Sequence, residues 1–247
     1  MKYNSTMRIV KSVYFRVKYF IMRQRRNYLV RRELPISVAT VNNDLFLGNS
    51  DTDISDHLNT IYAVAMAKKP KVILELGTRG GESTRVFSHV AEKFNCRGYS
   101  VDLSEAPEWL NKRSDWKHVV FDDTKFPQEI SRNWPDGSAF AGVDLLFLDT
   151  SHFYEHTLEE LHLYWDLINP DGVLILHDTN CTEKVTRRLS GKANRGWDNS
   201  RGVIRAVEEF FECKIDESNL ISLESLGKSA KGLTHYPWNN GITLVFK

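Results

Sequence analysis

The chain contains little cysteine. Its three cysteines, Cys96, Cys181 and Cys213, are widely spaced in 247 residues, and no CxxC motif or cysteine–histidine cluster occurs. This spacing indicates neither a disulfide framework nor a zinc site, and it is typical of a protein in a reducing compartment. We therefore expect a cytoplasmic protein.

Long apolar runs are also absent. Hydrophobic residues make up 41% of the chain and charged residues 26%, which excludes a wholly disordered, collagen-like or polytopic membrane protein. The apolar run at residues 19–22 is far too short to span a bilayer, and Arg16 and Lys18 interrupt the apolar core that a secretory signal needs. The length favours one domain, or one domain with an appendage.

Acidic residues are missing from the first 32 positions, which carry ten Lys or Arg, whereas the rest of the chain has 23 basic and 32 acidic residues. Such a basic arm indicates a membrane surface, a polyanion or an acidic partner. Its apolar residues alternate with basic ones, so two interpretations stay open. One is a helix that packs on the domain or on a second subunit, giving a homo-oligomer. The other is peripheral membrane contact of residues 1–32 through an interfacial helix on anionic lipid.

Nucleic acid is not an expected partner, because no platform of basic and aromatic residues follows in the body of the chain. We divide the chain into a basic helical extension, residues 1–50, and a folded domain, residues 51–247.

From residue 55 onward, short apolar runs alternate with segments of helical period. Strands are predicted near residues 71–76, 98–103, 118–121, 143–148, 173–176 and 242–246, with helices near 55–69, 83–94, 154–168 and 201–213. This alternation favours a doubly wound, mostly parallel α/β sheet with helices on both faces. Residues 122–141, 180–200 and 225–240 are predicted loops. The helix at 154–168 carries His156, His162, Glu155, Glu159 and Glu160, and most of these five residues are expected on its solvated face.

Polar residues or glycines follow five successive predicted strands. They are Glu75–Gly81, Asp102, Asp122 and Asp123, Asp149–His152, and His177–Asn180. Ligands of doubly wound sheets bind outside the carboxyl ends of the strands. We therefore expect these residues to line one binding cleft.

A glycine-rich turn, residues 77–81, follows the first strand, and Asp102 ends the second strand 25 residues after Gly77. Glycines permit close approach of a ligand to the backbone, and a carboxylate at that strand end can accept both hydroxyls of a ribose. Two cofactor classes fit, a nicotinamide dinucleotide and an adenosyl sulfonium. Arg79 stands where the dinucleotide fingerprint GxGxxG has its second glycine, which counts against NAD.

Two carboxylates, Asp149 and Asp178, end the fourth and fifth strands. They would repel each other unless a cation lies between them or one is protonated, and hard divalent ions take such ligands. A metal ion there could bind two vicinal oxygens of a substrate and lower the pKa of a hydroxyl. His152, three residues beyond Asp149, could take that proton as a general base, and the alkoxide would attack the sulfonium methyl group.

The motifs resemble a known family. Residues 75–83 (ELGTRGGES) resemble the first motif of class I S-adenosylmethionine (SAM) methyltransferases. The resemblance continues at residues 147–157, 172–179 and 202–210, and it is nearest the branch of cephalosporin-hydroxylase-like proteins and macrolide or rhamnosyl O-methyltransferases. It implies a Rossmann-like methyltransferase fold with a seven-stranded sheet.

The resemblance also implies roles for single residues. Glu75 and the turn that contains Gly77, Thr78, Gly80 and Gly81 would line the methionine part of SAM. Ser83 would lie near the SAM carboxylate, or it would cap the following helix. Asp102 would accept the ribose hydroxyls, and Asp122 or Asp123 would lie beside the adenine.

The pattern after strands four and five is similar to that of metal-dependent O-methyltransferases. Asp149 and Asp178 match their metal ligands, and His152 matches the base of the macrolide type. His177 departs from the family pattern, since that type has glutamate there; as a third ligand it could favour Mn²⁺ or a later metal over Mg²⁺, and it could instead be structural.

The sequence thus predicts a SAM-dependent O-methyltransferase, assisted by Mg²⁺ or another divalent cation, that acts on a hydroxyl of a small-molecule or sugar acceptor. The alternatives are an NAD-linked oxidoreductase of similar fold and a non-catalytic SAM-binding scaffold or peripheral protein.

Overall fold

The computed structural model describes residues 53–54, 57–130, 134–181, 184–186, 193–195, 200–237 and 239–247. The basic extension predicted at residues 1–50 lies outside these ranges, as does the subunit or lipid contact predicted for residues 1–32. The described residues belong to the predicted folded domain.

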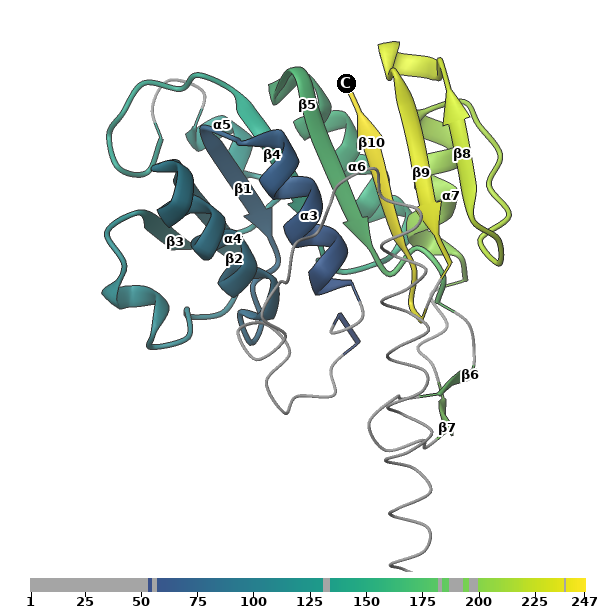
Figure 1. The fold of residues 1–247 in the computed structure, drawn as a ribbon, viewed down its shortest axis with the longest axis horizontal. Coiled ribbons are helices and arrows are strands. Elements are labelled where there is room, and N and C mark those ends of the chain that lie inside the picture. The colour runs from purple at the N-terminus through teal and green to yellow at the C-terminus, as the bar shows by residue number, and fades with distance from the viewer. Residues whose placement is uncertain are drawn as a thin grey trace, which may run out of the picture.

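The centre of the domain is a sheet of eight strands in the order β3-β2-β1-β4-β5-β10-β9-β8 (Figure 1). The strands are β1 (Val72–Leu76), β2 (Arg97–Asp102), β3 (Trp116–Val120), β4 (Val143–Leu148), β5 (Ile168–His177), β8 (Ile221–Glu224), β9 (Gly232–Tyr236) and β10 (Ile242–Phe246). Neighbours from β3 to β5 pair in parallel, whereas β10, β9 and β8 add on as antiparallel strands. The strand order reverses between β1 and β4, which is where doubly wound sheets bind ligands.

Helices cover both faces of this sheet (Figure 1). The main helices are α3 (Leu58–Lys68), α4 (Glu82–Phe94), α6 (Tyr154–Tyr164) and α7 (Gly202–Phe210), and α5 (Phe126–Glu129) is a single turn. Successive strand residues point to opposite faces, so β1 contributes to two cores. Ile73 packs among residues of α3 and α4, whereas Leu74 packs among residues of α6 and α7. The predicted doubly wound architecture is confirmed.

The strand count implied by the resemblance is wrong by one, because the main sheet has eight strands. The predicted loop at residues 225–240 contains β9, which pairs with β10 on one side and β8 on the other. Only two of its five residues, Leu233 and Tyr236, are apolar, so it lacks the apolar run expected of a buried strand. Pairing with both neighbours forms the strand despite this composition.

Smaller differences occur next to the predicted loops. The helix predicted at residues 154–168 ends at Tyr164, where the 3₁₀ turn η2 (Trp165–Leu167) leads into β5. The predicted loop at 180–200 contains a two-stranded hairpin of β6 (Lys184–Thr186) and β7 (Ala193–Arg195). Two further 3₁₀ turns are η1 (Leu110–Lys112) and η3 (Gly227–Ser229).

Within the described ranges, no helix combines the length and the apolar character that crossing a bilayer requires.

Candidate active site at the carboxyl ends of the strands

The glycine turn after β1 lies directly against the end of β4. Gly77 has a φ of 86°, and a Cβ at this position would collide with the backbone carbonyl of Asp149. The Gly77 amide donates to Val101 O of β2 at 2.9 Å, and the Asp149 amide donates to Leu76 O of β1 at 2.9 Å. Only glycine fits at residue 77, and it brings the turn and Asp149 together.

Asp102, at the end of β2, holds this turn in place. Its Oδ2 accepts the backbone N–H groups of Thr78 at 2.7 Å and Arg79 at 3.0 Å, while Oδ1 accepts that of Ser104 at 2.8 Å. Burial would raise the pKa of Asp102, but these three N–H groups lower it below its ordinary value. Asp102 is therefore an anion that organises the turn.

Glu75 lies beneath the turn and is completely buried. It accepts hydrogen bonds from the hydroxyls of Ser83 at 2.6 Å and Thr84 at 2.7 Å, both in the first turn of α4. Burial raises the pKa of Glu75 to about 8, although the two hydroxyls oppose that shift. Ser83 does not cap α4, since the N-cap position is Gly81. Its side chain instead ties α4 to β1, and its contact with SAM stays a prediction.

Four ionisable side chains meet where β4 and β5 end, and we call Asp149, His152, His177 and Asp178 the rim quartet. His152 bridges the two carboxylates, with Nδ1 2.7 Å from Asp178 Oδ2 and Nε2 3.1 Å from Asp149 Oδ1. His177 Nδ1 lies 3.2 Å from Asp149 Oδ1 and 3.4 Å from Asp178 Oδ1. The side chains of His177 and Asp178 are almost fully buried, and those of Asp149 and His152 are less than a quarter exposed.

The charges of the rim quartet balance. Burial would lower the pKa of both histidines, but the carboxylates raise the pKa of His152 to about 10 and that of His177 to about 9. Burial would raise the pKa of Asp149 and Asp178, but the two histidines hold both below the ordinary value. Two imidazolium ions thus face two carboxylates, and the four groups titrate as a unit.

The backbone of the rim quartet is constrained. His152 and Asp178 have φ values of 62° and 54°, which few residues other than glycine adopt. Gly202, the first residue of α7, packs so closely on this loop that a Cβ would collide with the carbonyl of His152. Such backbone strain is common where surrounding structure fixes functional side chains.

The arrangement can hold a cation. One ligand atom each from Asp149, His152 and Asp178 lie within 4.8 Å of one another. His177, the third ligand proposed from the sequence, faces both carboxylates through Nδ1. Two carboxylates with imidazole nitrogens are a donor set for a divalent ion.

The two aspartates after β3 point in different directions. Asp122 binds its own turn, accepting from Thr124 and pairing with Lys125 at 2.7 Å. Asp123 faces α6, with its Oδ1 3.1 Å from His156 Nε2. Of the two aspartates, Asp123 is the one whose carboxylate contacts α6.

Glu160 does not lie on the solvated face predicted for most polar residues of α6, because its side chain is 1% exposed, whereas that of His156 is 28% exposed. The buried residues of α6 are Thr157, Glu160, Leu161 and Tyr164. Their spacing of three, four and seven residues is itself the helical period. That period could have identified Glu160 as buried, because Leu161 and Tyr164 fix the same face.

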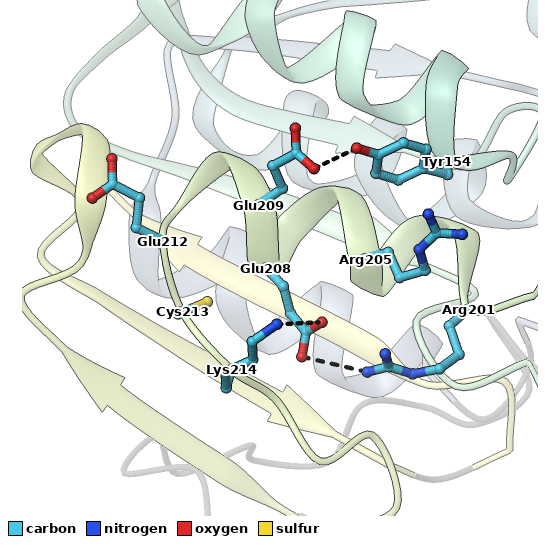
Figure 2. A pocket seen from close by; sticks show the side chains of 8 residues that line it. All are labelled: Tyr154, Arg201, Arg205, Glu208, Glu209, Glu212, Cys213 and Lys214. Atoms are coloured by element: carbon cyan, nitrogen blue, oxygen red, sulfur yellow. Dashed lines mark hydrogen bonds and ion pairs between the residues drawn. The ribbon is translucent and has the colours of Figure 1, made fainter.

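A hollow of about 610 Å³ lies beside the rim, over α7 and the start of α6 (Figure 2). Charged side chains that line it are paired: Glu208 pairs with Arg201 at 3.4 Å and with Lys214 at 3.8 Å, and Tyr154 donates to Glu209. Arg201 also lines a small space next to Asp178. None of the site residues predicted from the sequence lines the larger hollow.

Comparison with known proteins finds similarity in part of the sequence and in the fold. Residues 74–179 match a family model described as a methyltransferase domain. The fold is similar to the SAH-bound methyltransferase PaMTH1 of Podospora anserina, at 12% identity and a TM-score of 0.52, over 100% of this chain and 98% of that one. A structure described as a caffeoyl-CoA O-methyltransferase from Staphylococcus aureus is 13% identical with a TM-score of 0.50, over 91% of this chain and 99% of that one.

Part of the chain is also similar to a curated protein of a different kind. A signal recognition particle 54 kDa protein from Pyrobaculum arsenaticum is 28% identical over 122 residues, which are 45% of this chain. This chain spans only 28% of the length of that relative.

The fold is similar to that of these methyltransferase structures, and residues 74–179 match the model of a methyltransferase domain. The resemblance read from the motifs is confirmed for the fold and for the residues that match the family model.

Proposed function

We propose that this chain is a SAM-dependent methyltransferase that transfers a methyl group to a hydroxyl oxygen of a small-molecule or glycosyl acceptor. One observation carries the proposal: the Gly77 turn lies against the backbone of Asp149, so a cofactor on the turn would end beside the rim quartet. The SAH bound in the Podospora anserina relative supports the same cofactor here.

The cofactor would lie across the ends of β1 and β2. The turn from Gly77 to Gly81 would face the methionine part, and Asp102 would accept the ribose hydroxyls with the lone pairs that its backbone partners leave unused. Asp123 would lie nearer the adenine than Asp122, because Asp122 is bound within its own turn.

A divalent cation fits Asp149 and Asp178, with His177 Nδ1 as a third donor between them. When bound, such an ion would lower the pKa of an acceptor hydroxyl and orient it. The protons on His152 and His177 carry the same total charge as one divalent ion. Both histidines would therefore release protons on ion binding, which would leave His152 able to act as a base.

The proposed methyl transfer is a single displacement at the methyl carbon. The acceptor oxygen forms a bond to the methyl carbon as the sulfonium S–C bond breaks, and the sulfonium becomes a neutral thioether. The hydroxyl proton goes to a ring nitrogen of His152. The protein contributes mainly position and charge, as in other reactions that need no covalent enzyme intermediate.

The first test is cofactor choice. We expect SAM to raise the thermal midpoint of the full chain and NAD⁺ to leave it unchanged, because a ligand that binds only the folded state stabilises it. Asp102→Asn should weaken SAM binding about tenfold or more in calorimetry, since one ribose acceptor becomes a donor. Stabilisation by NAD⁺ alone would favour the oxidoreductase alternative.

The second test separates binding from chemistry. His152→Gln should retain SAM affinity and lower methyl transfer by a factor on the order of 10²–10⁴ with any acceptor found in a panel of hydroxyl compounds. Full activity of this variant would exclude His152 as the base. Tight SAM binding with no transfer to any acceptor would instead support the scaffold alternative.

A further inference from the structure

A second group of ionisable side chains contacts the loop that follows β4, residues 149–153, which we call the β4 loop and which also carries two members of the rim quartet. Asp123 follows β3, while His156 and Glu160 lie one turn apart on α6, and we call these three residues the α6 cluster. One ligand atom from each lies within 4.8 Å of the others. Residues four apart on a helix share one face, so His156 and Glu160 present their donors together.

The distances in the α6 cluster fit ligands of one ion as well as an ion pair. His156 Nε2 lies 3.1 Å from Asp123 Oδ1 and 3.7 Å from Glu160 Oε1. Nε2 is buried, and among the described residues it has no partner in hydrogen-bond geometry. Bonds of 2.0–2.2 Å at tetrahedral angles place two zinc ligands about 3.4 Å apart.

Glu160 supplies an independent observation. Its side chain is 1% exposed, and within the described part of the chain its Oε2 has no hydrogen-bond partner. Its Oε1 accepts a hydrogen bond from the Thr150 hydroxyl at 2.9 Å. A buried carboxylate oxygen without a partner is costly, and a bound cation would satisfy it.

The scaffold around the α6 cluster is fixed. The Tyr164 hydroxyl donates to the backbone carbonyl of Asp123 at 2.6 Å, which ties the loop after β3 to α6. Thr150 orients the Glu160 carboxylate, as hydrogen-bond partners of metal ligands commonly do. His156 is 28% exposed, so solvent reaches part of its side chain.

We propose that Asp123, His156 and Glu160 form a second divalent-cation site of the Zn²⁺ class, separate from the rim quartet. One imidazole and two carboxylates are ligands that Zn²⁺ accepts, and their charges cancel those of the ion. The bound ion would fasten the loop after β3 to α6 and so stabilise this edge of the cofactor site. Asp123 Oδ1 would then be a ligand of the ion.

The experiment uses Zn²⁺ alone, added to chelator-treated full chain. We expect Asp149→Asn/Asp178→Asn, which removes both quartet carboxylates, to retain one Zn²⁺ equivalent in calorimetry. Adding Glu160→Gln to it should weaken that binding about tenfold or more. Glu159→Gln, an exposed neighbour on the same helix, is the matched control and should leave the affinity unchanged.

A second comparison does not depend on the folding of the quartet variant. Zn²⁺ should raise the thermal midpoint of the wild-type chain more than that of His156→Ala, whose altered side chain is partly exposed. An equal shift in both proteins would overturn the proposal, as would equal Zn²⁺ affinity of the Glu160→Gln and Glu159→Gln proteins. Neither result depends on SAM binding, so the proposed function could fail while this site stands.

Discussion

The rim quartet and the α6 cluster are neighbours with different charge balance. They adjoin at the β4 loop, where Asp149 belongs to the first and Thr150 donates to Glu160 of the second. The quartet pairs two histidines with two carboxylates, so two protons neutralise it. The α6 cluster has one histidine for two carboxylates, and one proton cannot neutralise it.

This difference appears in the carboxyl groups. The pKa of both quartet aspartates is held below the ordinary value despite burial. Burial raises the pKa of Glu160, and the nearby His156, whose own pKa the carboxylates raise to about 10, does not fully offset it. Without an ion, the quartet stabilises the fold and Glu160 destabilises it at neutral pH.

The largest effect is expected from removing one quartet carboxylate. Asp178→Asn leaves two buried imidazolium groups with a single carboxylate, which should lower the free energy of unfolding by about 3–5 kcal/mol at pH 7. Urea denaturation measures this loss. Asp171→Asn, an exposed carboxylate on the β5 segment away from the rim, is the control and should change it little. If Asp178→Asn lowered the free energy of unfolding as little as the control does, the ion pairs of the quartet would not stabilise the fold.

The pH dependence of stability gives the next largest effect. The folded-state pKa values of His152 and His177 are raised to about 10 and about 9, above the ordinary value of 6.5. Their stabilisation is therefore complete below about pH 6.5 and is lost as the pH rises toward 10. In chelator-treated protein, we expect the free energy of unfolding to fall by on the order of 2–4 kcal/mol across this pH range.

His152→Gln should remove much of that slope, measured by urea unfolding at pH 6.5, 8 and 9.5. An unchanged slope in this variant would assign the pH dependence to other groups, His156 among them.

Glu160→Gln should have the opposite sign to Asp178→Asn. Because burial raises the pKa of Glu160, its destabilising effect grows as the pH rises above about 4.5. In chelator-treated protein, the variant should have a higher free energy of unfolding than wild type at pH 7. The gain should be smaller than the loss caused by Asp178→Asn. Near pH 4, the variant and wild type should be equally stable. If Glu160→Gln were less stable than wild type at both pH values, the Glu160 carboxylate would stabilise the fold as the quartet carboxylates do.

Thr150→Val tests the link between the two groups and should have the smallest effect. It removes one hydrogen bond to a buried carboxylate, worth about 1 kcal/mol of unfolding free energy. Thr124→Val removes a similar hydroxyl bond to the half-exposed Asp122 and should cost less. Equal losses would show that burial of Glu160 does not strengthen its bond to Thr150.

Much of the fold could be predicted from the sequence. Apolar runs such as residues 143–148 and the polar residues that follow them fixed the parallel strands and their carboxyl ends, since parallel strand ends share one edge. β9 was not predicted, because its residues form no apolar run and its pairing with β8 and β10 is decided by tertiary structure.

The site was predictable where backbone rules apply and less so where packing decides. Gly77 was identifiable because no other residue can adopt its conformation so close to Asp149. The bond between Ser83 and Glu75 was not predicted, since it depends on how α4 packs on β1. Glu160 was misplaced because its residue type favours solvent while its position in the α6 period favours the core.

The sequence by itself determined which residue types stand at the ends of the strands, because strand period and glycine conformation are local properties. Only the tertiary structure decided which charges face one another. Asp149 and Asp178 are 29 residues apart in the chain, yet His152 bridges them, and α6 turns Glu160 toward Asp123. Burial at those meeting points, which depends on how distant segments pack together, sets the pKa of each group.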